Sequence, residues 1–389
     1  MDVMTRMPAL LFATLLGACG GHTLDLGGAQ PDASKTDSVP DAHSVPDARA
    51  EVASWPVPAQ PNARSLHSLG PHLYWMATEA TTSEIRRCEK SDCGNTQTTL
   101  TRINGEIMGF EIRGDTIYGA TLTSIFSCPI DDCTKVNTIV AGIAPRGLAV
   151  DETNVYWSEW FGDKNLYMWA LDGPQRSPSI ALIGAAPLEL AIDGSRIYWT
   201  VQGSPSVGTI AVMSAPKGNL GAATTIAADQ NQAAALTLHG GYVYWTTSYA
   251  LGTVVRCPIT GCAGGAPEVL AERQPYPHFL QTDGDFVFWM NGPKAPDTSP
   301  SRERPVQILG CQLPNCASSI EVLDEGLGGG FGARANATWG GIQGALPAKE
   351  LVADEKAIYW FGDVVNASTI TATGARVDAS VRRTERPVK

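Results

Sequence analysis

The stretch LAVDETNVYW, from Leu148 to Trp157, recurs along the chain and decides its fold. Four close copies share its apolar start, polar centre and aromatic end: LAIDGSRIYW (190–199), LTLHGGYVYW (236–245), LQTDGDFVFW (280–289) and LVADEKAIYW (351–360). Two more divergent copies are LHSLGPHLYW (66–75) and FEIRGDTIYG (110–119). The usual spacing is about 42 residues, which is typical of a four-stranded β-propeller blade. We therefore predict an all-β fold, a seven-bladed β-propeller of four-stranded antiparallel blades.

Each repeat predicts the first two strands of a blade and the turn between them. In the opening copy, Leu148–Val150 is the first strand, 151–154 the turn and Val155–Trp157 the second strand. Both strands are apolar on both faces, as expected for a sheet packed between two neighbours. In the fifth repeat, 254–258 and 268–270 are expected as the third and fourth strands. The shared turn position favours a structural role for its aspartates, rather than a catalytic one: Asp151, Asp193, Asp283 and Asp354.

Composition narrows the classes of function. Of 389 residues, 17% are charged and the formal net charge is −11. No basic stripe is present, so a nucleic-acid partner is excluded. The 40 glycines and 26 prolines suit a fold with many tight turns. We assign residues 63–389 to the propeller.

The N-terminus predicts export. Met7 to Ala18 is an apolar run that is too short to span a bilayer and suits the core of a signal peptide. The run ends in Leu16-Gly17-Ala18-Cys19, which resembles the signal of bacterial lipoproteins. That resemblance implies a signal peptide over 1–18, acylation of Cys19, and sorting to the outer membrane because Gly20 rather than Asp follows the cysteine. The alternative is a free cysteine after an ordinary signal peptide.

Residues 19–62 are expected to form a flexible tether. The segment is rich in Pro, Ala, Asp and Ser and has few large apolar residues, so it lacks the surface needed for a core. We expect it to hold the propeller away from the membrane. Trp55 either docks on the first blade or belongs to a free linker.

The Tyr-Trp pair near the end of most copies resembles the YWTD and NHL-like repeats of extracellular propellers. The resemblance covers the chain from about residue 65 by its period, and is weak within each repeat. Ser158-Glu159, Thr200-Val201 and Thr246-Thr247 follow the Trp where the family has Thr-Asp. The Asp-centred network of that family and its six-blade count therefore do not carry over.

Eight of the nine cysteines form Cys-x4-Cys pairs, each at the predicted turn between the third and fourth strands of a blade: Cys88/Cys93, Cys128/Cys133, Cys257/Cys262 and Cys311/Cys316. Residues flanking a short hairpin loop face each other at a distance that a disulfide can bridge. Zinc would require two pairs to meet, whereas outer turns of adjacent blades diverge. We predict four disulfides on exposed outer hairpins, each worth about 2 kcal/mol or less.

Antiparallel connectivity divides the connections between two faces. We call the side with the first-to-second and third-to-fourth strand turns the turn face. The other side, which carries the second-to-third strand loops and the connections between blades, is the loop face. Two long insertions, 291–305 and 326–347, belong to the loop face, where binding sites are usual. The alternatives are neutral drift of surface loops and a hidden eighth blade.

Ten residues on the loop face are candidates for ligand binding. Trp160-Phe161-Gly162-Asp163 has a counterpart in 360–363, and both are placed in second-to-third strand loops. His278 is placed near the mouth of the axial channel. The candidates are Trp160, Asp163, Lys164, His278, Lys294, Arg302, Arg304, Arg334, Asn336 and Trp339.

Catalytic signals are scarce. The chain has no Gly-x-Ser-x-Gly elbow, no His-Glu-x-x-His and no phosphate-binding glycine loop. Glu189 and His278 could contribute to a channel-mouth site of the kind that propeller lactonases and lyases use, but two residues do not make a site. We assign no catalytic residue, no metal and no cofactor.

Three functions remain open. The preferred one is a monomeric, lipid-anchored, non-enzymatic propeller of the cell envelope that binds a protein or glycan through its loop face. The second is a lactonase- or lyase-type enzyme with a metal at the channel mouth. The third is a structural envelope scaffold. Closure of the ring is also open: 369–376 is expected as the third strand of the last blade, and its fourth comes from 377–383 or from residues near Val52.

Overall fold

A computed structural model describes the chain over 53–55, 63–79, 81–159, 165–172, 178–181, 186–202, 211–292, 305–327, 351–354, 357–364 and 378–385. All of these residues belong to the compact unit Arg49–Lys389. They are built almost entirely of β-strands, with two short 3-10 helices, η1 (Ala263–Gly265) and η2 (Cys316–Ser318). The predicted signal peptide and most of the predicted tether lie outside the described residues.

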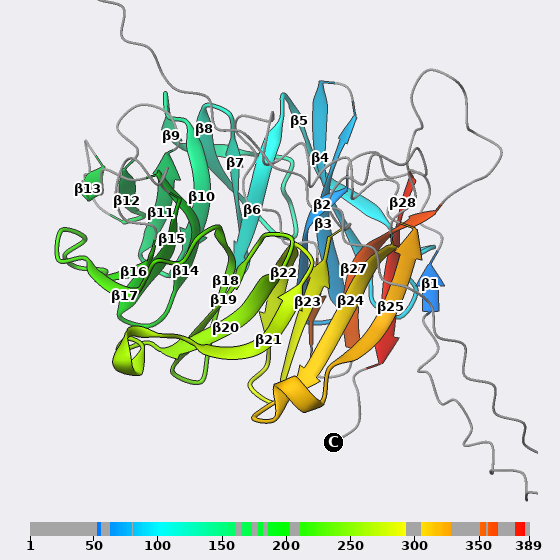
Figure 1. Ribbon diagram of the computed structural model, residues 1–389. Coiled ribbons are helices and arrows are strands. Elements are labelled where there is room, and N and C mark those ends of the chain that lie inside the picture. The colour runs from blue at the N-terminus through cyan, green and yellow to red at the C-terminus, as the bar shows by residue number, and fades with distance from the viewer. Residues whose placement is uncertain are drawn as a thin grey trace, which may run out of the picture. The chain divides into compact units, whose positions relative to one another are not determined.

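Six blades are each made of four strands that are consecutive in the chain and antiparallel in the sheet (Figure 1). Blade 1 has β2 (Arg64–Leu69), β3 (His72–Glu79), β4 (Thr82–Glu89) and β5 (Thr98–Asn104). Blade 2 has β6 (Ile107–Arg113), β7 (Thr116–Thr121), β8 (Ser124–Pro129) and β9 (Asn137–Ala141). Blade 3 has β10 (Pro145–Val150), β11 (Asn154–Glu159), β12 (Leu166–Ala170) and β13 (Ser179–Ala181).

The next three blades follow the same plan. Blade 4 has β14 (Ala186–Ile192), β15 (Arg196–Gln202), β16 (Ala211–Pro216) and β17 (Thr224–Ala228). Blade 5 has β18 (Ala233–His239), β19 (Tyr242–Thr247), β20 (Gly252–Pro258) and β21 (Glu268–Gln274). Blade 6 has β22 (Pro277–Thr282), β23 (Phe286–Asn291), β24 (Pro305–Gln312) and β25 (Glu321–Leu327).

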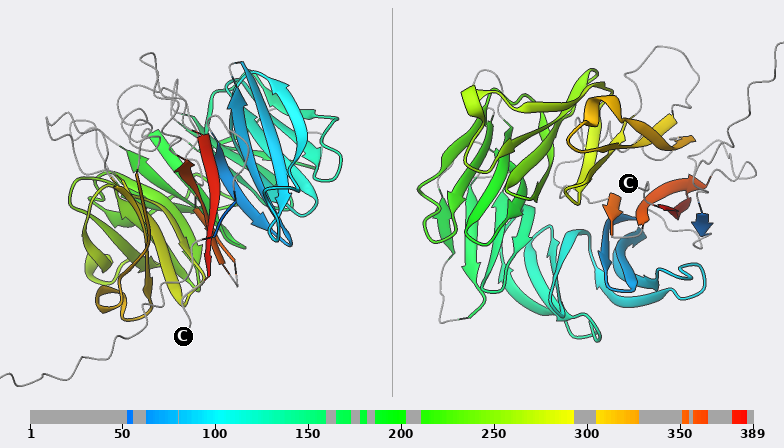
Figure 2. Two further views of the ribbon diagram at one scale, coloured as in Figure 1. Left: turned by 90° about the vertical axis from the view of Figure 1, so that its right-hand side faces the viewer. Right: turned by 90° about the horizontal axis from the view of Figure 1, so that it is seen from below.

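The remaining four-stranded sheet is composite, in the order β1-β28-β27-β26. Three of its strands come from the C-terminal end: β26 (Leu351–Ala353), β27 (Ala357–Val364) and β28 (Asp378–Glu385). The fourth, β1 (Ala53–Trp55), comes from the end of the predicted tether and pairs antiparallel with β28. This composite sheet closes the arrangement, because its innermost strand β26 contacts both β22 of blade 6 and β2 of blade 1. Figure 2 (right) shows the sheets of this unit following one another about a common centre.

The prediction of seven equivalent blades is therefore corrected. In the part of the chain that the structure describes, six blades are built from consecutive strands, and the last sheet takes a strand from the other end of the unit. The strand that pairs with β27 is β28, and the predicted strand 369–376 lies outside the described residues. Of the two sources considered for the outermost strand, the residues just after Val52 provide it. Trp55 lies in this sheet and not in blade 1.

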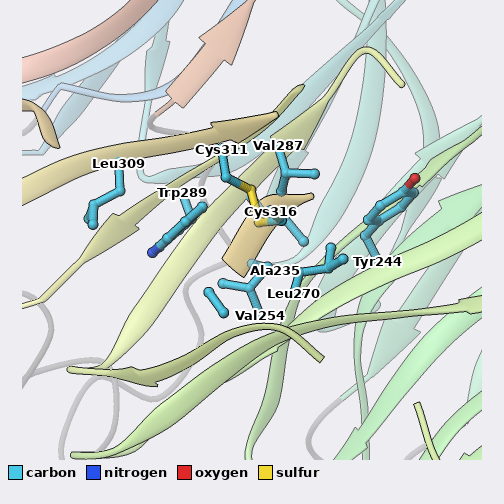
Figure 3. Close-up of a cluster of buried hydrophobic side chains, with 11 residues drawn as sticks. Ala235, Tyr244, Val254, Leu270, Val287, Trp289, Leu309, Cys311 and Cys316 are labelled. Atoms are coloured by element: carbon cyan, nitrogen blue, oxygen red, sulfur yellow. A yellow bond between two sulfur atoms is a disulfide. The ribbon is translucent and has the colours of Figure 1, made fainter. Parts of the chain in front are cut away.

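The Tyr-Trp pair holds neighbouring blades together. Successive residues of a strand point to opposite faces, so the two rings of a pair face different neighbours. Tyr244 and Trp289, from blades 5 and 6, are buried in one cluster with Val254, Leu270 and Leu309 (Figure 3). The Trp residues of the repeat are at most 2% exposed: Trp75, Trp157, Trp199, Trp245, Trp289 and Trp360. Their regular spacing along the chain is therefore explained by core packing.

In the divergent second repeat, a Phe on the neighbouring strand compensates for the missing Trp. Gly119 stands where other copies have Trp, and its cross-strand partner is Phe126. A Cβ atom on Gly119 would lie 2.1 Å from Cζ of that ring. Phe126, 2% exposed, therefore fills the space that the missing indole leaves.

Because Phe126 occupies this space, even a small side chain at position 119 should be harmful. We expect Gly119→Ala to lower the free energy of unfolding by about 1–3 kcal/mol, because the Phe126 ring must leave its packed position. Urea unfolding of the 49–389 fragment measures the loss. In the background of Phe126→Ala, the same Gly119→Ala change should cost much less, since the ring is gone. Equal costs in both backgrounds would show that Phe126 does not fill this space.

The turn aspartates are structural, as predicted. Asp151 Oδ1 accepts hydrogen bonds from the backbone N–H groups of Thr153 (2.9 Å) and Asn154 (2.8 Å). Its Oδ2 accepts a hydrogen bond from Tyr156 Oη at 3.2 Å and forms an ion pair with Lys217 Nζ of blade 4 at 2.8 Å. Burial alone would raise the pKa of Asp151, but these hydrogen bonds outweigh it and hold the pKa at about 2. Asp354 makes the corresponding ion pair with Lys90 of blade 1, at 2.6 Å.

All four predicted disulfides are present, and each joins the end of a third strand to the turn that follows it. Their Cα–Cα distances are 4.8 to 5.0 Å. The four bonds are Cys88–Cys93, Cys128–Cys133, Cys257–Cys262 and Cys311–Cys316.

The predicted exposure of these disulfides is corrected. Seven of the eight cysteines are buried, and Cys93, which was expected in an exposed turn, is 0% exposed. The eighth, Cys262, is half-buried and packs against the cluster of Tyr198 and Trp245. Its backbone N–H also donates to Ile226 O of blade 4, at 3.2 Å. The cysteine side chains therefore lie against the preceding sheet, whereas other residues of the same turns, such as Asp131 and Asp132, are exposed.

The bridges are buried because each packs on the repeat Tyr of the sheet before it. Cys88 and Cys93 lie in a cluster with Tyr359 of the composite sheet. In blade 4, which has no cysteine pair, Ala215 and Leu220 occupy the equivalent contact with Tyr156. The remaining clusters join Cys128 and Cys133 to Tyr74, Cys257 and Cys262 to Tyr198, and Cys311 and Cys316 to Tyr244.

Candidate functional site

The inner strands share a β-bulge near the start of each first strand on the loop face. The register shifts there in all six continuous blades. The residue two positions before the repeat Leu is ionisable in three blades, as Arg64, Arg146 and His278. The next residue has a positive φ in blade 1 (Ser65, 55°) and blade 6 (Phe279, 53°). The bulge therefore sets these ionisable side chains in a common position at the axial end of the loop face.

Two of the three ionisable side chains interact with a carboxylate of the next blade. Arg64 of blade 1 forms an ion pair with Glu106, which directly precedes β6. Burial lowers the pKa of Arg146, and the negative charge of Glu189 in blade 4 acts in the opposite direction. Glu189 Oε2 also accepts the backbone N–H of Leu236 in blade 5, at 3.0 Å. The Arg64–Glu106 ion pair and the Glu189–Leu236 hydrogen bond link neighbouring blades.

His278 links blades 5 and 6. Its Nδ1 lies 3.2 Å from Ser248 Oγ, and its ring meets Phe279 edge-on at 5.4 Å between centroids. The backbone of Gly292 lies against the other side of the ring, since a Cβ there would be 2.8 Å from Nε2. Burial lowers the pKa of His278 to about 4, and a backbone hydrogen bond at Pro277 opposes this only weakly. The imidazole is therefore neutral at pH 7 and held on several sides.

A buried polar network lies beside His278. Trp289 Nε1 donates to Gln274 Oε1 (3.2 Å) and Asn291 Oδ1 (3.1 Å). Asn291 Nδ2 in turn donates to Gln274 Oε1 at 2.9 Å. The network joins the last residue of blade 5 to the end of β23 in blade 6, so it fixes the connection between these blades.

The loop between β19 and β20 presents apolar side chains on the same face. Tyr249 and Leu251 are 39% and 64% exposed. The loop is held in place because Tyr249 O accepts the N–H groups of Gly252 (3.0 Å) and Tyr276 (2.9 Å). An exposed aromatic ring on a well-supported loop is the kind of group that dominates protein interfaces.

Sequence reasoning placed only part of this site. Of the ten candidate residues, only His278 lies in the part of the chain that the structure describes, where it contacts Ser248 of blade 5. The other nine lie outside the described residues: Trp160, Asp163, Lys164, Lys294, Arg302, Arg304, Arg334, Asn336 and Trp339. The counterpart 360–363 is not in a loop, because these residues pair with 379–382 within β27 and β28.

Two sets of residues were missed. Hydroxyl side chains directly after the repeat Trp bind the backbone of the bulge: Ser158 Oγ accepts Gly147 N–H at 2.8 Å, and Thr246 Oγ1 donates to Ala234 O at 3.1 Å. The recurring Ser or Thr after Trp was the available signal. The exposed loop was missed because Ser-Tyr-Ala-Leu-Gly at 248–252 carries no charge and matches no motif.

Neither metal nor membrane-spanning signals occur in the described part of the chain. Within it, no three or more His, Cys, Asp or Glu side chains gather as a metal site. No helix found there is long and apolar enough to cross a bilayer.

The comparisons with known proteins give the fold alone. No protein-family model and no curated protein sequence matches the chain. Among solved structures, prolyl endopeptidases match with a TM-score of 0.50 and 13% identity over 67% of this chain and 42% of theirs. The nidogen/laminin complex matches with 0.41 and 19% over 54% and 83%. A putative 6-phosphogluconolactonase from Bacteroides uniformis matches with 0.44 and 11% over 65% and 81%. The observed sheets define a β-propeller of four-stranded antiparallel blades.

Proposed function

We propose that the chain is a non-enzymatic, lipid-anchored propeller of the bacterial envelope that binds a protein or glycan through its loop face. The observation that carries the proposal is the division of roles on that face. Arg64, Arg146 and His278 interact with neighbouring blades, as a scaffold requires, whereas Tyr249 and Leu251 point outward. Fold alone does not settle function, whereas these side chains distinguish a scaffold from a binding surface.

The same proposal includes the location of the protein. Cys19 carries the lipid, and the segment after it spaces the propeller from the membrane. The binding residues include Tyr249 and Leu251 together with the nine sequence candidates of the insertions and the blade-3 loop.

Binding through the loop face is tested with immobilised 49–389 fragment and solubilised envelope or envelope glycans. We expect a partner that the wild type and Leu69→Ser retain, and that Tyr249→Ala and Leu251→Ser lose. Leu69 is the matched control, because it is 44% exposed but lies on the turn face. Retention by all variants, or by none of the proteins including the wild type, would contradict the proposal.

The anchor is tested separately in cells of a bacterial host. Cys19→Ser should abolish labelling by a fatty-acid analogue and move the protein from the membrane fraction to the soluble one. Labelling that persists in this variant would rule out Cys19 as the lipid site.

A further inference from the structure

The two connections on either side of blade 5 have an unusual backbone. Among the described residues, seven residues other than glycine have a positive φ, and six of them lie within 229–235 and 273–279. They recur with the same spacing in both segments: Asp229, Gln232 and Ala235, then Arg273, Tyr276 and Phe279. The connections before blades 2 and 3 instead use glycine for positive φ, Gly105 at 112° and Gly142 at 75°. Side chains are therefore kept beside blade 5 in a conformation where glycine is less strained, which points to a role for the side chains themselves.

Three of these residues are exposed and have hydrogen-bonding groups without a partner. The side chains of Asp229, Gln232 and Arg273 make no hydrogen bond or ion pair within the part of the chain that the structure describes. A carboxylate, an amide and a guanidinium together supply both donors and acceptors. Since no contact inside the described protein explains these three side chains, they are available to an external ligand.

The ring of Tyr249 lies between the two connections, because backbone hydrogen bonds join all three segments. The N–H of Ser248 donates to Gln232 O at 2.9 Å. On the other side, the N–H of Tyr276 donates to Tyr249 O, also at 2.9 Å. The loop 248–251 is therefore held between the connections, and the side chain of Tyr249 is 39% exposed there.

Arg273 is fixed beside the same loop. The next residue, Gln274, is the register partner of Gly252, the first residue of β20. Gln274 itself is buried, and its Oε1 accepts hydrogen bonds from Trp289 and Asn291. Because successive residues of a strand point to opposite sides, the buried Gln274 leaves Arg273 at the surface. We call the following four exposed residues the blade-5 platform: Asp229, Gln232, Tyr249 and Arg273.

We propose that the blade-5 platform binds a neutral saccharide. The Tyr249 ring offers an apolar face to the C–H groups of a pyranose, and the flanking carboxylate, amide and guanidinium groups match its hydroxyls. A protein partner matches these groups less well, because the core of a protein interface is depleted of charged residues. A neutral sugar fits better than an acidic one, since the formal net charge of −11 repels anions. This inference rests on the proposed function and deepens it, because it selects a glycan as the ligand of the loop face.

Binding is measured between the 49–389 fragment and immobilised neutral oligosaccharides of glucose, mannose and N-acetylglucosamine. We expect the wild type to bind at least one of them. Tyr249→Leu should bind that sugar about tenfold more weakly, because leucine keeps an apolar contact but not the flat ring. Tyr249→Phe keeps the ring and should stay within about threefold of the wild type. Equal losses in both variants would show that the ring does not stack on the sugar.

Glycine substitutions separate the polar side chains from the backbone that holds them. Gln232→Gly and Arg273→Gly remove the polar groups but suit a positive φ, so the fold should be kept. Each should weaken binding about fivefold, through the loss of hydrogen bonds to the sugar. Ser65→Gly is the matched control, because Ser65 also has a positive φ (55°) but lies buried in blade 1, and it should bind as the wild type does.

The outcomes separate this inference from the proposed function. If no immobilised sugar binds the wild type, while an envelope protein is retained by the wild type and Leu69→Ser and lost by Tyr249→Ala, the loop face binds a protein and the saccharide inference is wrong. If neither a sugar nor an envelope component is retained, both are wrong. Sugar binding that Gln232→Gly and Arg273→Gly leave unchanged would overturn the blade-5 platform as the site.

Discussion

Trp289→Ala is expected to lower the free energy of unfolding by about 4 kcal/mol. The indole is fully buried between blades 5 and 6, and removal of a buried Trp costs about 3–5 kcal/mol through lost contacts and the cavity that remains. The change also removes the donor that Gln274 and Asn291 share. Both acceptors are themselves buried, which adds to the cost. Urea unfolding of the 49–389 fragment at pH 7 measures the effect.

Two controls divide this loss into packing and hydrogen bonding. Leu251→Ala, at a 64% exposed residue, should change stability by no more than about 0.5 kcal/mol. Trp289→Phe keeps most of the ring but no indole N–H, and we expect a cost between those of the other two variants. A loss of less than about 1 kcal/mol for Trp289→Ala would mean that this cluster does not join the blades.

The second large effect is a loss of stability in mild acid that depends on His278. Its pKa is lowered from 6.5 to about 4 in the folded protein, mainly by burial. The folded state therefore favours the neutral ring, and this contribution is complete above pH 6.5. As the pH falls from 6.5 to 4, the unfolded chain binds a proton that the folded chain does not, which lowers stability by about 3 kcal/mol. His278→Gln should remove this part of the pH dependence.

Urea midpoints at pH 7, 5.5 and 4.5 provide the measurement. Ser248→Ala is the matched control: it removes the hydroxyl beside Nδ1 but leaves the ring buried, so the slope should remain. Asp151 does not interfere, because its lowered pKa of about 2 places its effect below pH 4. An unchanged slope in His278→Gln would show that another group causes the acid sensitivity.

His278 has a structural role at the junction of blades 5 and 6, as Arg64 and Arg146 have at other junctions. A neutral imidazole fixed against Ser248 and Gly292 is arranged to support the junction of two blades. Arg64 and Arg146 likewise interact with carboxylates of the next blade. The same face exposes Tyr249 and Leu251, which take no part in these contacts. Binding experiments on this face are therefore the most direct route to function.

Local patterns were enough for much of the fold. The alternation of apolar run, polar turn and Tyr-Trp pair predicted the first two strands of each repeat, because strand and turn preferences act over a few residues. The Cys-x4-Cys spacing predicted four disulfides for the same reason, since both cysteines flank one short turn. The turn position of Asp151 likewise indicated backbone hydrogen bonds rather than catalysis.

Only the tertiary structure decided how distant parts combine. The burial of Cys93 and the packing of Cys262 on blade 4 depend on the neighbouring sheet, which the spacing of the cysteines does not reveal. Phe126 replaces the indole missing at Gly119, a compensation that shows only when the strands are in register.

The same holds for contacts between blades and for closure of the ring. The partners of Arg64 and His278 belong to neighbouring blades, and the repeat does not encode which side chains meet there. The closing pair of β1 and β28 joins residues near opposite ends of the unit. Two strands so far apart in the chain pair through backbone hydrogen bonds, which any sequence can form. The geometry of the complete ring therefore determines that β1 pairs with β28, and no local sequence pattern predicts it.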